Sequence, residues 1–213
     1  MPRSCYVVLF LALVACGCSC RATGAKVVPG PAAAPFAAVE QALIARTVEP
    51  FPESGAFRKG RLRQAVVYDG IPCDHWLHLY ENGVLHGCRL ASPTTVQGHL
   101  LPAGAQLWFD SNGFLESCWL GTNTLIDGRL CRGRGKISTG FYPSGRLRSF
   151  FPPAALQIDG VPCRASVFAP VTLYEDGHLR RCTLDSEYRS GSNTLPAGSP
   201  VLRDESGVVR VVE

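Results

Sequence analysis

A glycine-centred turn recurs along most of this 213-residue chain, with the same residue types around it each time. The glycines are Gly83, Gly113, Gly145 and Gly177, so the intervals are 30, 32 and 32 residues. A fixed period of this length is typical of a repeat array, in which each unit packs on its neighbours. The repeat therefore constrains the chain to stacked supersecondary units, which present surfaces more readily than they enclose an active site.

The residues around each turn alternate as they do in β-strands. Relative to the turn glycine, apolar residues recur at −4, +2, +5, +7 and +13, and a second glycine follows at about +15. Positions +5, +7 and +13 share one parity, so we expect them on one face of the sheet. The leucine at +2 breaks that parity, which predicts a β-bulge beside each turn, at Leu85, Leu115, Leu147 and Leu179.

Two turn chemistries alternate in each unit. In pairs such as Asn82-Gly83 and Asp176-Gly177, glycine supplies a positive φ and the residue before it tolerates the left-handed conformation. The second turn has the type Asp-Gly-Ile/Val-Pro-Cys, and degenerate units near Gly60 and Gly207 flank the full turns. The prediction is an all-β fold: an extended antiparallel meander of repeated β-hairpins, about five units over residues 53–213, with a short N-terminal helix.

Three turn motifs carry a family resemblance: Leu79-Tyr80-Glu81-Asn82-Gly83, Phe141-Tyr142-Pro143-Ser144-Gly145 and Leu173-Tyr174-Glu175-Asp176-Gly177. They resemble the MORN-like hairpin repeats, in particular the variant in YwqK-type antitoxin proteins, over about residues 55–213. The resemblance implies the same extended meander and no catalytic residues. It also implies an alternative function, that of an antitoxin-like or immunity-type binding protein. The chain departs from that family in its export signal and in its added cysteines, which suit a module outside the cytoplasm.

The N-terminus predicts export. Arg3 precedes an unbroken apolar run over residues 6–15, which is too short to span a bilayer and suits the hydrophobic region of a signal peptide. The run ends in Leu13-Val14-Ala15-Cys16-Gly17, which resembles the bacterial lipobox. Residues 1–15 are therefore a predicted lipoprotein signal peptide and Cys16 the predicted lipidated residue, with an ordinary secretory signal as the alternative. The expected location is the cell envelope, where the lipid anchors the chain to the outer membrane at its periplasmic or surface face.

The segment between this signal and the repeats falls into two parts. Residues 16–35 are small, rich in Pro and Gly and almost uncharged, which predicts a flexible tether. Residues 36–52 are predicted to hold a short helix over 36–47 and a linker, because Phe36, Val39, Leu43 and Ile44 follow Pro35 at helical intervals. We expect its apolar stripe to cover the first open end of the array.

Six cysteines fall in the repeat region at two recurring positions, three residues after a second-turn glycine or five after a first-turn glycine. In an oxidising compartment they are disulfide candidates. The expected pairing, one of 15 possible connectivities, is Cys73–Cys88, Cys118–Cys131 and Cys163–Cys182. The alternative to disulfides is a zinc site formed by Cys73, His75, His78, His86 and Cys88. The ligand spacing lacks the usual CxxC form, so no metal or cofactor is expected.

Titratable residues give little support for catalysis. His99, His178, Asp159 and Asp176 lie on or beside turns and match no recognised catalytic motif, so the chain is not expected to be an enzyme, with a hydrolase as a minor alternative. The net charge is only +4, although arginines cluster over residues 129–148. In an exported protein such a cluster is more often a solvated face or a contact with anionic lipid or polysaccharide, so no nucleic-acid partner is expected.

Aromatic residues recur beside the turns, at Trp76, Tyr80, Trp108, Trp119, Phe141, Tyr142 and Tyr174. A row of aromatic side chains along a sheet can bind glycan or peptide. The alternative, which the sequence favours, is that these large side chains shield a thin core. The predicted function is an exported, lipid-anchored repeat scaffold that binds an unknown protein or polysaccharide of the envelope.

Overall fold

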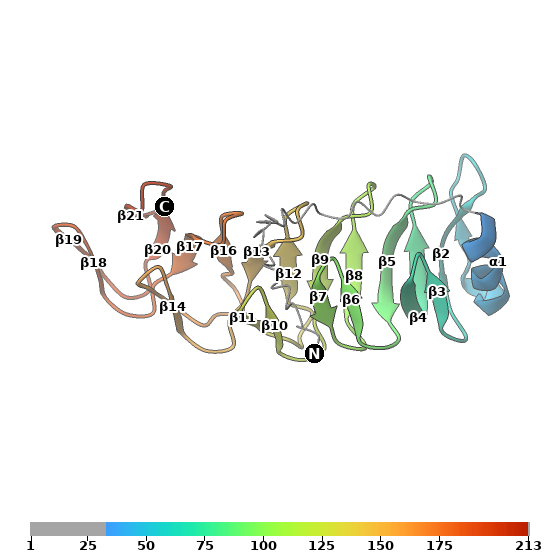
Figure 1. The fold of residues 1–213 in the computed structure, drawn as a ribbon, viewed down its shortest axis with the longest axis horizontal. Helices are drawn as coiled ribbons and strands as arrows, with labels where there is room; N and C mark the ends of the chain where they lie inside the picture. Colours follow the sequence, from blue (N-terminus) through green and yellow to red (C-terminus); the bar gives the residue numbers. More distant parts are fainter. Residues whose placement is uncertain (1–32, 213) are drawn as a thin grey trace, which may run out of the picture.

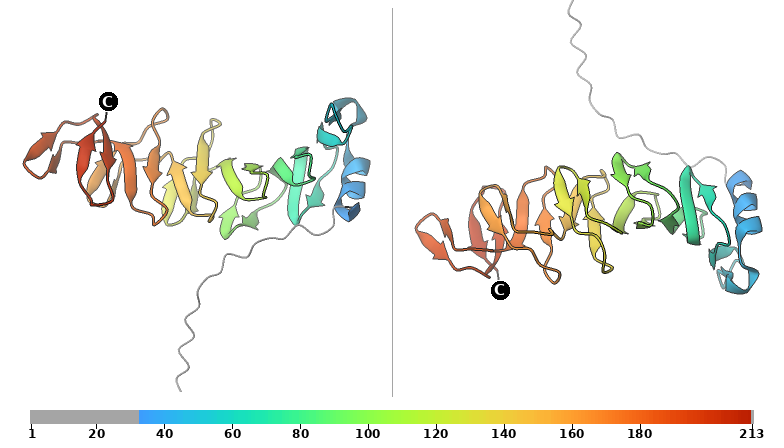
Figure 2. Two further views of the ribbon diagram at one scale, coloured as in Figure 1. Left: turned by 90° about the horizontal axis from the view of Figure 1, so that it is seen from above. Right: turned by 90° about the horizontal axis from the view of Figure 1, so that it is seen from below.

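The computed structural model describes residues 33–212 and is an elongated, nearly all-β structure (Figure 1). Within that range the main sheet has 13 strands in the order β1-β2-β4-β5-β8-β9-β12-β13-β16-β17-β20-β21, with β3 paired to β4. Every pairing is antiparallel, and strands follow the order of the chain. Figure 2 shows from above and below that the units follow one another along the long axis. The predicted antiparallel meander of hairpins is confirmed.

The strands of the main sheet are short, except for the nine-residue β4. They are β1 (Glu49–Pro50), β2 (Phe57–Arg61), β3 (Val66–Tyr68), β4 (Ile71–Leu79), β5 (Leu85–Leu90), β8 (Gln106–Phe109), β9 (Leu115–Trp119), β12 (Ser138–Phe141), β13 (Leu147–Phe150), β16 (Val171–Leu173), β17 (Leu179–Thr183), β20 (Pro200–Arg203) and β21 (Val209–Val211).

The second turn of each unit is a small hairpin of its own, separate from the main sheet. Four such side hairpins occur in the described chain, and they run along one side of the main sheet in Figure 1. They are β6 (Thr94–Val96) with β7 (His99–Leu101), β10 (Thr124–Ile126) with β11 (Arg129–Cys131), β14 (Leu156–Ile158) with β15 (Val161–Cys163), and β18 (Tyr188–Ser190) with β19 (Asn193–Leu195). In the first unit β4 is long enough to pair with β3 and then continue into the main sheet.

The two turn types have different backbone conformations. At the first type only the glycine has a positive φ, for example 81° at Gly83, whose N–H donates to the Tyr80 carbonyl at 2.9 Å. At the second turns joining β3–β4, β6–β7, β10–β11 and β14–β15 both central residues do, for example Asp127 (φ 46°) and Gly128 (φ 72°), as in a type I′ hairpin, whereas between β18 and β19 only Gly191 does (φ 61°). The prediction that glycine supplies the positive φ at Gly83 and Gly177 is confirmed.

The predicted bulge beside each first turn is confirmed. His78 pairs with Gly87 while the next residue, Leu79, pairs with Leu85, so His86 is the extra residue. The same shift occurs at the other three full turns, where Glu116, Arg148 and Arg180 are the extra residues. Each bulge returns the leucine at +2 to the buried face of the sheet.

The core lies between the main sheet and the row of side hairpins. Leu77, Cys88 and Leu107 on the main sheet are fully buried, and so is Leu101 on a side hairpin. All of them belong to one apolar cluster that runs through the described chain. Each fully buried leucine contributes about 1.5–3 kcal/mol, so the two layers stabilise each other along the whole array.

The N-terminal helix α1 (Ala33–Ala42) is followed by the 3₁₀ turn η1 (Ala45–Thr47). The predicted helix over 36–47 therefore ends early, because Leu43 bridges to Leu62 and the Ile44 N–H donates to the Arg61 carbonyl at 2.9 Å. Val39, Ala42 and Leu43 are buried and belong to the apolar core cluster, so this segment covers the first end of the array. Neither described helix is long and apolar enough to cross a bilayer.

Candidate functional site

All three tryptophans of the chain lie together on the main-sheet face opposite the core, which we call the open face. Trp76 on β4, Trp108 on β8 and Trp119 on β9 alternate with buried core residues, and each is half-buried. The ring centroids of Trp76 and Trp108 are 6.1 Å apart, and those of Trp108 and Trp119 are 4.6 Å apart. These three side chains, the tryptophan platform, expose aromatic surface on three strands.

Two backbone features place Trp76 on this platform. His75 has a φ of 60° inside β4, where the register with β5 shifts between Asp74 and Leu77. A bulge of this kind redirects the side chains beside it. Gly87 on the intervening strand β5 has no side chain, and a Cβ there would lie 3.2 Å from the Trp76 ring. Trp76 therefore lies over Gly87 and reaches toward Trp108.

A groove of about 900 Å³ leads onto the platform from the N-terminal end of the array. Trp76, Trp108 and His78 form part of its wall, together with polar side chains of β1, β2 and β8, namely Glu49, Lys59, Arg61 and Gln106. Lys59 and Glu49 form an ion pair at 2.9 Å. The groove thus combines aromatic faces with hydrogen-bond donors and acceptors, which is the general composition of a ligand site.

His78 extends the platform as a neutral ring. Its centroid lies 4.7 Å from that of Trp76 and 6.2 Å from that of His86. Burial, with added repulsion from His86, Lys59 and Arg58, lowers the pKa of His78 to about 4. At neutral pH the imidazole is therefore uncharged and offers one donor and one acceptor.

The tryptophans do not follow the repeat. Trp108 lies five residues before its turn glycine, and the corresponding residues of the other units are His78, Gly140 and Thr172. Core positions, in contrast, hold similar apolar residues in every unit. Because the repeat architecture does not need an aromatic residue at these positions, the platform is a local feature of the N-terminal units.

The other four aromatic residues singled out in the sequence have structural roles. Phe141 is buried in the core, as predicted by the interpretation that these aromatic side chains shield a thin core. Tyr80, Tyr142 and Tyr174 each donate a hydrogen bond of 2.7–2.9 Å to a backbone carbonyl at the start of the next first turn. The three tryptophans differ from these four residues, because their parity places them on the face opposite the core, half-buried and in contact with neighbouring rings.

The six repeat-region cysteines are buried, and the structure brings them together in the three expected pairs. The Cys73 thiol donates to the Ile71 carbonyl at 3.4 Å, and the Cys163 thiol donates to the Val161 carbonyl at 3.5 Å. The neighbouring Cys88 and burial raise the pKa of the Cys73 thiol, and burial raises that of Cys131, near Cys118, to about 12. All six are free thiols in this structure, so the disulfides stay a prediction. Cys16 lies outside the described residues.

The residues of the rival zinc reading are separated by the sheet. Cys73 and Cys88 are buried on the core side, whereas His78 and His86 contact each other's rings on the open face. The side chain of His75 is 67% exposed. Within residues 33–212, no group of three or more His, Cys, Asp or Glu side chains is arranged to hold a metal ion.

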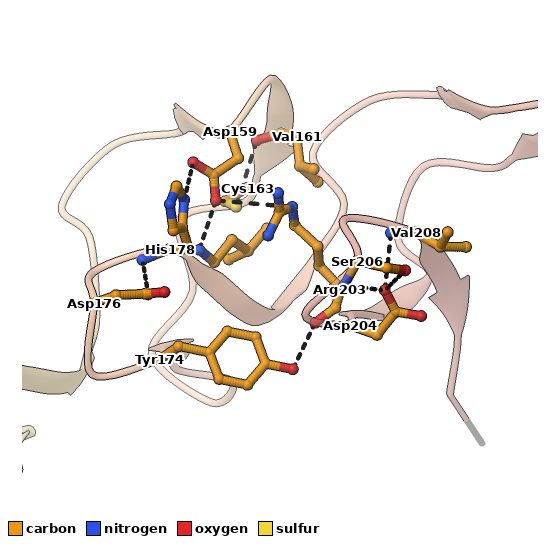
Figure 3. Close-up of polar contacts among 11 residues, drawn as sticks. Asp159, Val161, Cys163, Tyr174, Asp176, His178, Arg203, Asp204, Ser206 and Val208 are labelled. Carbon is orange, nitrogen blue, oxygen red and sulfur yellow. Dashed lines mark hydrogen bonds and ion pairs between the residues drawn. The ribbon is translucent and has the colours of Figure 1, made fainter.

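A second polar cluster surrounds His178 near the C-terminal end of the array (Figure 3). Asp159 accepts a hydrogen bond from the Leu179 N–H at 2.7 Å and lies 3.1 Å from the His178 ring. Burial alone would raise the pKa of Asp159, but these hydrogen bonds and nearby Arg203 lower it overall. Tyr174 donates to the Arg203 carbonyl at 2.9 Å in the same region.

The same arrangement one unit earlier gives this cluster a structural role. Asp127 accepts from the Leu147 N–H at 2.8 Å and faces Arg146, as Asp159 accepts from Leu179 and faces Arg203. Each aspartate therefore ties a side-hairpin turn to the bulge of the following first turn. Within the described chain the His178 ring hydrogen-bonds only to Asp159, which also fixes the turn through the Leu179 N–H.

Fold and platform together define an all-β hairpin-repeat protein with an exposed aromatic surface near its capped end. No protein-family profile matches the chain, and no curated protein or solved structure matches it. The assignment of the open face as a binding surface therefore depends on its geometry and chemistry.

Proposed function

We propose that this protein is an exported, lipid-anchored, non-enzymatic repeat scaffold that binds a protein or an envelope polymer on its open face. The observation that carries the proposal is the tryptophan platform. Three half-buried tryptophans lie within contact distance of one another at positions that the repeat does not require. Tryptophan is enriched where a surface becomes buried by a partner.

The anchoring part of the proposal rests on the sequence around Cys16. The relation to MORN-like repeats is likewise a proposal, supported by the turn motifs and compatible with the hairpin array. An antitoxin-like or immunity-type binder is the second candidate, and it would use the same kind of open surface. The two candidates differ in the partner, which is a component of the envelope in the first and a specific toxin protein in the second.

Capture from envelope fractions tests the proposal. Full-length protein and the W76A/W108A variant are used as baits, with Phe168→Ala as the matched control, because Phe168 is 93% exposed on a loop outside the platform. We expect wild type and the control to retain the same envelope component, and the platform variant to lose it while circular dichroism shows an intact fold. Equal retention by all three baits would show that the platform is not the binding surface. Retention of one protein that is a known toxin would favour the second candidate.

A further inference from the structure

We propose that the ligand of the open face is an anionic polysaccharide, whose chain lies across the sheet from the tryptophan platform to Arg148 and Arg181. This inference rests on the proposed binding function and names the chemical class of its ligand. It is argued from three properties of the open face beyond the platform: its row of small side chains, its arginines without acidic partners, and the absence of large apolar side chains from the row between Trp108 and Arg181.

A continuous row of directly paired residues leads away from Trp108. Trp108 pairs with Ser117, and the row continues through Gly140, Ser149 and Thr172 to Arg181. We call the residues from Ser117 to Arg181 the polar track. Neighbouring strands lie about 4.8 Å apart, so the five steps from β8 to β17 span roughly 24 Å. The paired positions between Trp108 and Arg181 hold only glycine, serine and threonine. Their small size leaves room for an extended polymer.

The charges at the far end of this track favour an anionic ligand, whereas the bulge beside Ser117 carries Glu116. Arg148 lies over the track, because a Cβ built on Gly140 would be 3.4 Å from its Nη2 atom. Arg148 and Arg181 are exposed, and neither has an ion-pair partner among the described residues. Other arginines of the same fold do face carboxylates, as Arg146 faces Asp127 and Arg203 faces Asp159. Guanidinium groups that lack such a partner can bind carboxylate or sulfate groups through paired hydrogen bonds.

The composition of the track favours a glycan over a protein or a nucleic acid. A stable protein interface has an apolar centre, but no large apolar side chain occupies the row between Trp108 and Arg181, and the next paired residue beyond it, Leu202, lies at its far end. Single-stranded nucleic acids also stack on aromatic rings, but they need a dense cationic groove. Two arginines without partners over roughly 24 Å provide a sparse charge. A polysaccharide with stacking sugar rings, hydroxyls and occasional acidic groups matches all three properties.

Intrinsic fluorescence gives a direct test, because every tryptophan of the chain belongs to the platform. Full-length protein in detergent is titrated with two matched pairs of probes: polygalacturonate with its methyl ester, and dextran sulfate with dextran. We expect a saturable fluorescence change with at least one anionic polymer and much weaker binding of its uncharged partner. Trp108→Ala should weaken binding by about tenfold, measured by retention on the immobilised polymer.

Variants of the two arginines test whether positive charge contributes to binding. The R148E/R181E variant should lose about tenfold or more in affinity for the anionic polymer, while its affinity for the uncharged partner stays the same. Arg189→Glu, the same charge reversal at a single exposed residue of a side hairpin, should leave both affinities unchanged. Higher salt should weaken wild type and the control but have little further effect on R148E/R181E.

Several results would overturn the inference. They are binding of neither anionic polymer, equal binding of charged and uncharged partners, an unchanged affinity in R148E/R181E, and tighter binding of poly(dT) than of either glycan. If these occur while envelope capture still depends on Trp76 and Trp108, the proposed function stands and only the ligand class is wrong. If capture also becomes independent of the platform, both proposals fail.

Discussion

Gly87 shows how one small residue decides the geometry of the platform. A Cβ at this position would lie 2.8 Å from the Leu107 carbonyl oxygen and 3.2 Å from the Trp76 ring. The first contact is closer than Cβ atoms approach other atoms and is with backbone that cannot easily move, while the second would require the Trp76 ring to shift by a few tenths of an ångström. The missing side chain therefore allows Trp76 to lie across β5.

Gly87→Ala should destabilise the protein by about 1–3 kcal/mol, because the added methyl group overpacks this site. It should also displace the Trp76 ring and change the tryptophan emission spectrum. Urea unfolding followed by fluorescence measures both effects. Gly121→Ala is the matched control, since a Cβ there would meet the Ala103 carbonyl oxygen at an ordinary 3.8 Å. Equal stability of the two variants would contradict this account of the platform.

His78 gives the open face a defined pH dependence. Its pKa falls from 6.5 to about 4 in the folded protein, so between these values the unfolded chain binds a proton that the folded chain does not. The contribution of His78 to the free energy of unfolding is therefore fully present above about pH 6.5, and it is lost as the pH falls toward 4.

His78→Gln should remove this part of the acid sensitivity. Thermal melts of wild type and variant between pH 8 and pH 4 would show wild type losing more stability over the range from about 6.5 to 4. The difference between the two proteins should be constant above pH 7 and should stop changing once the pH is below about 4. Parallel melting curves across the whole range would mean that His78 titrates as it does in the unfolded chain.

At the scale of elements, the sequence predicted the hairpins because their turn glycines recur with a fixed period and their neighbours alternate. It also predicted the bulge, since leucine at +2 breaks the alternation. It did not separate the second turns from the main sheet, because a two-residue turn reads the same in a meander and in a detached hairpin. It also missed the open face, since the bulge at His75 shifts the parity of β4 just before Trp76.

Gly113→Val tests whether the first turns are strained by any side chain. A Cβ there would meet only Val84 at an ordinary 3.8 Å, so the effect comes from the positive φ of 83°. We expect a loss of about 1–2 kcal/mol. Hydrogen exchange should show weaker protection around residues 100–130 and little change around Gly177, because each unit contacts mainly its neighbours. Glu116→Gln on the adjacent exposed bulge is the control, and equal loss of protection along the whole chain would contradict the repeat scaffold.

The cysteine pairs would join the two layers of the fold. Cys88, Cys118 and Cys182 lie on main-sheet strands, whereas Cys131 and Cys163 lie on side hairpins and Cys73 on the part of β4 that pairs with β3. Non-reducing peptide mapping of exported protein should give Cys73–Cys88, Cys118–Cys131 and Cys163–Cys182. Each bond would add about 3 kcal/mol in the chain-entropy model. Free thiols at Cys73 or Cys163 would contradict this pairing.

At the scale of the whole molecule, the array has one face for packing and one for contact. The core, the tyrosine hydrogen bonds and the aspartate links repeat along the chain, while the tryptophan platform and the arginines of the polar track do not. The repeated features could be predicted from the sequence because periodicity reveals them. The unrepeated ones could not, because only the strand register shows that Trp108 and Arg181 belong to one row.

The open face can bind an envelope polymer only if the chain resides in the envelope, and Cys16 is the residue predicted to hold it there.

Cys16→Ser removes the thiol that would carry the lipid, so the variant should move from the membrane fraction to the soluble fraction and lose its acyl chains. Cys18→Ser is the matched control, because Ala15 would then fill the position at which the lipobox prefers leucine. It should remain in the membrane. Because every residue of the platform lies within the described residues 33–212, far along the chain from Cys16, soluble Cys16→Ser protein should still bind the polymer that wild type binds. A Cys16→Ser protein that keeps its acyl chains would show that another residue is lipidated, and one that is soluble but no longer binds would show that anchoring and recognition are coupled.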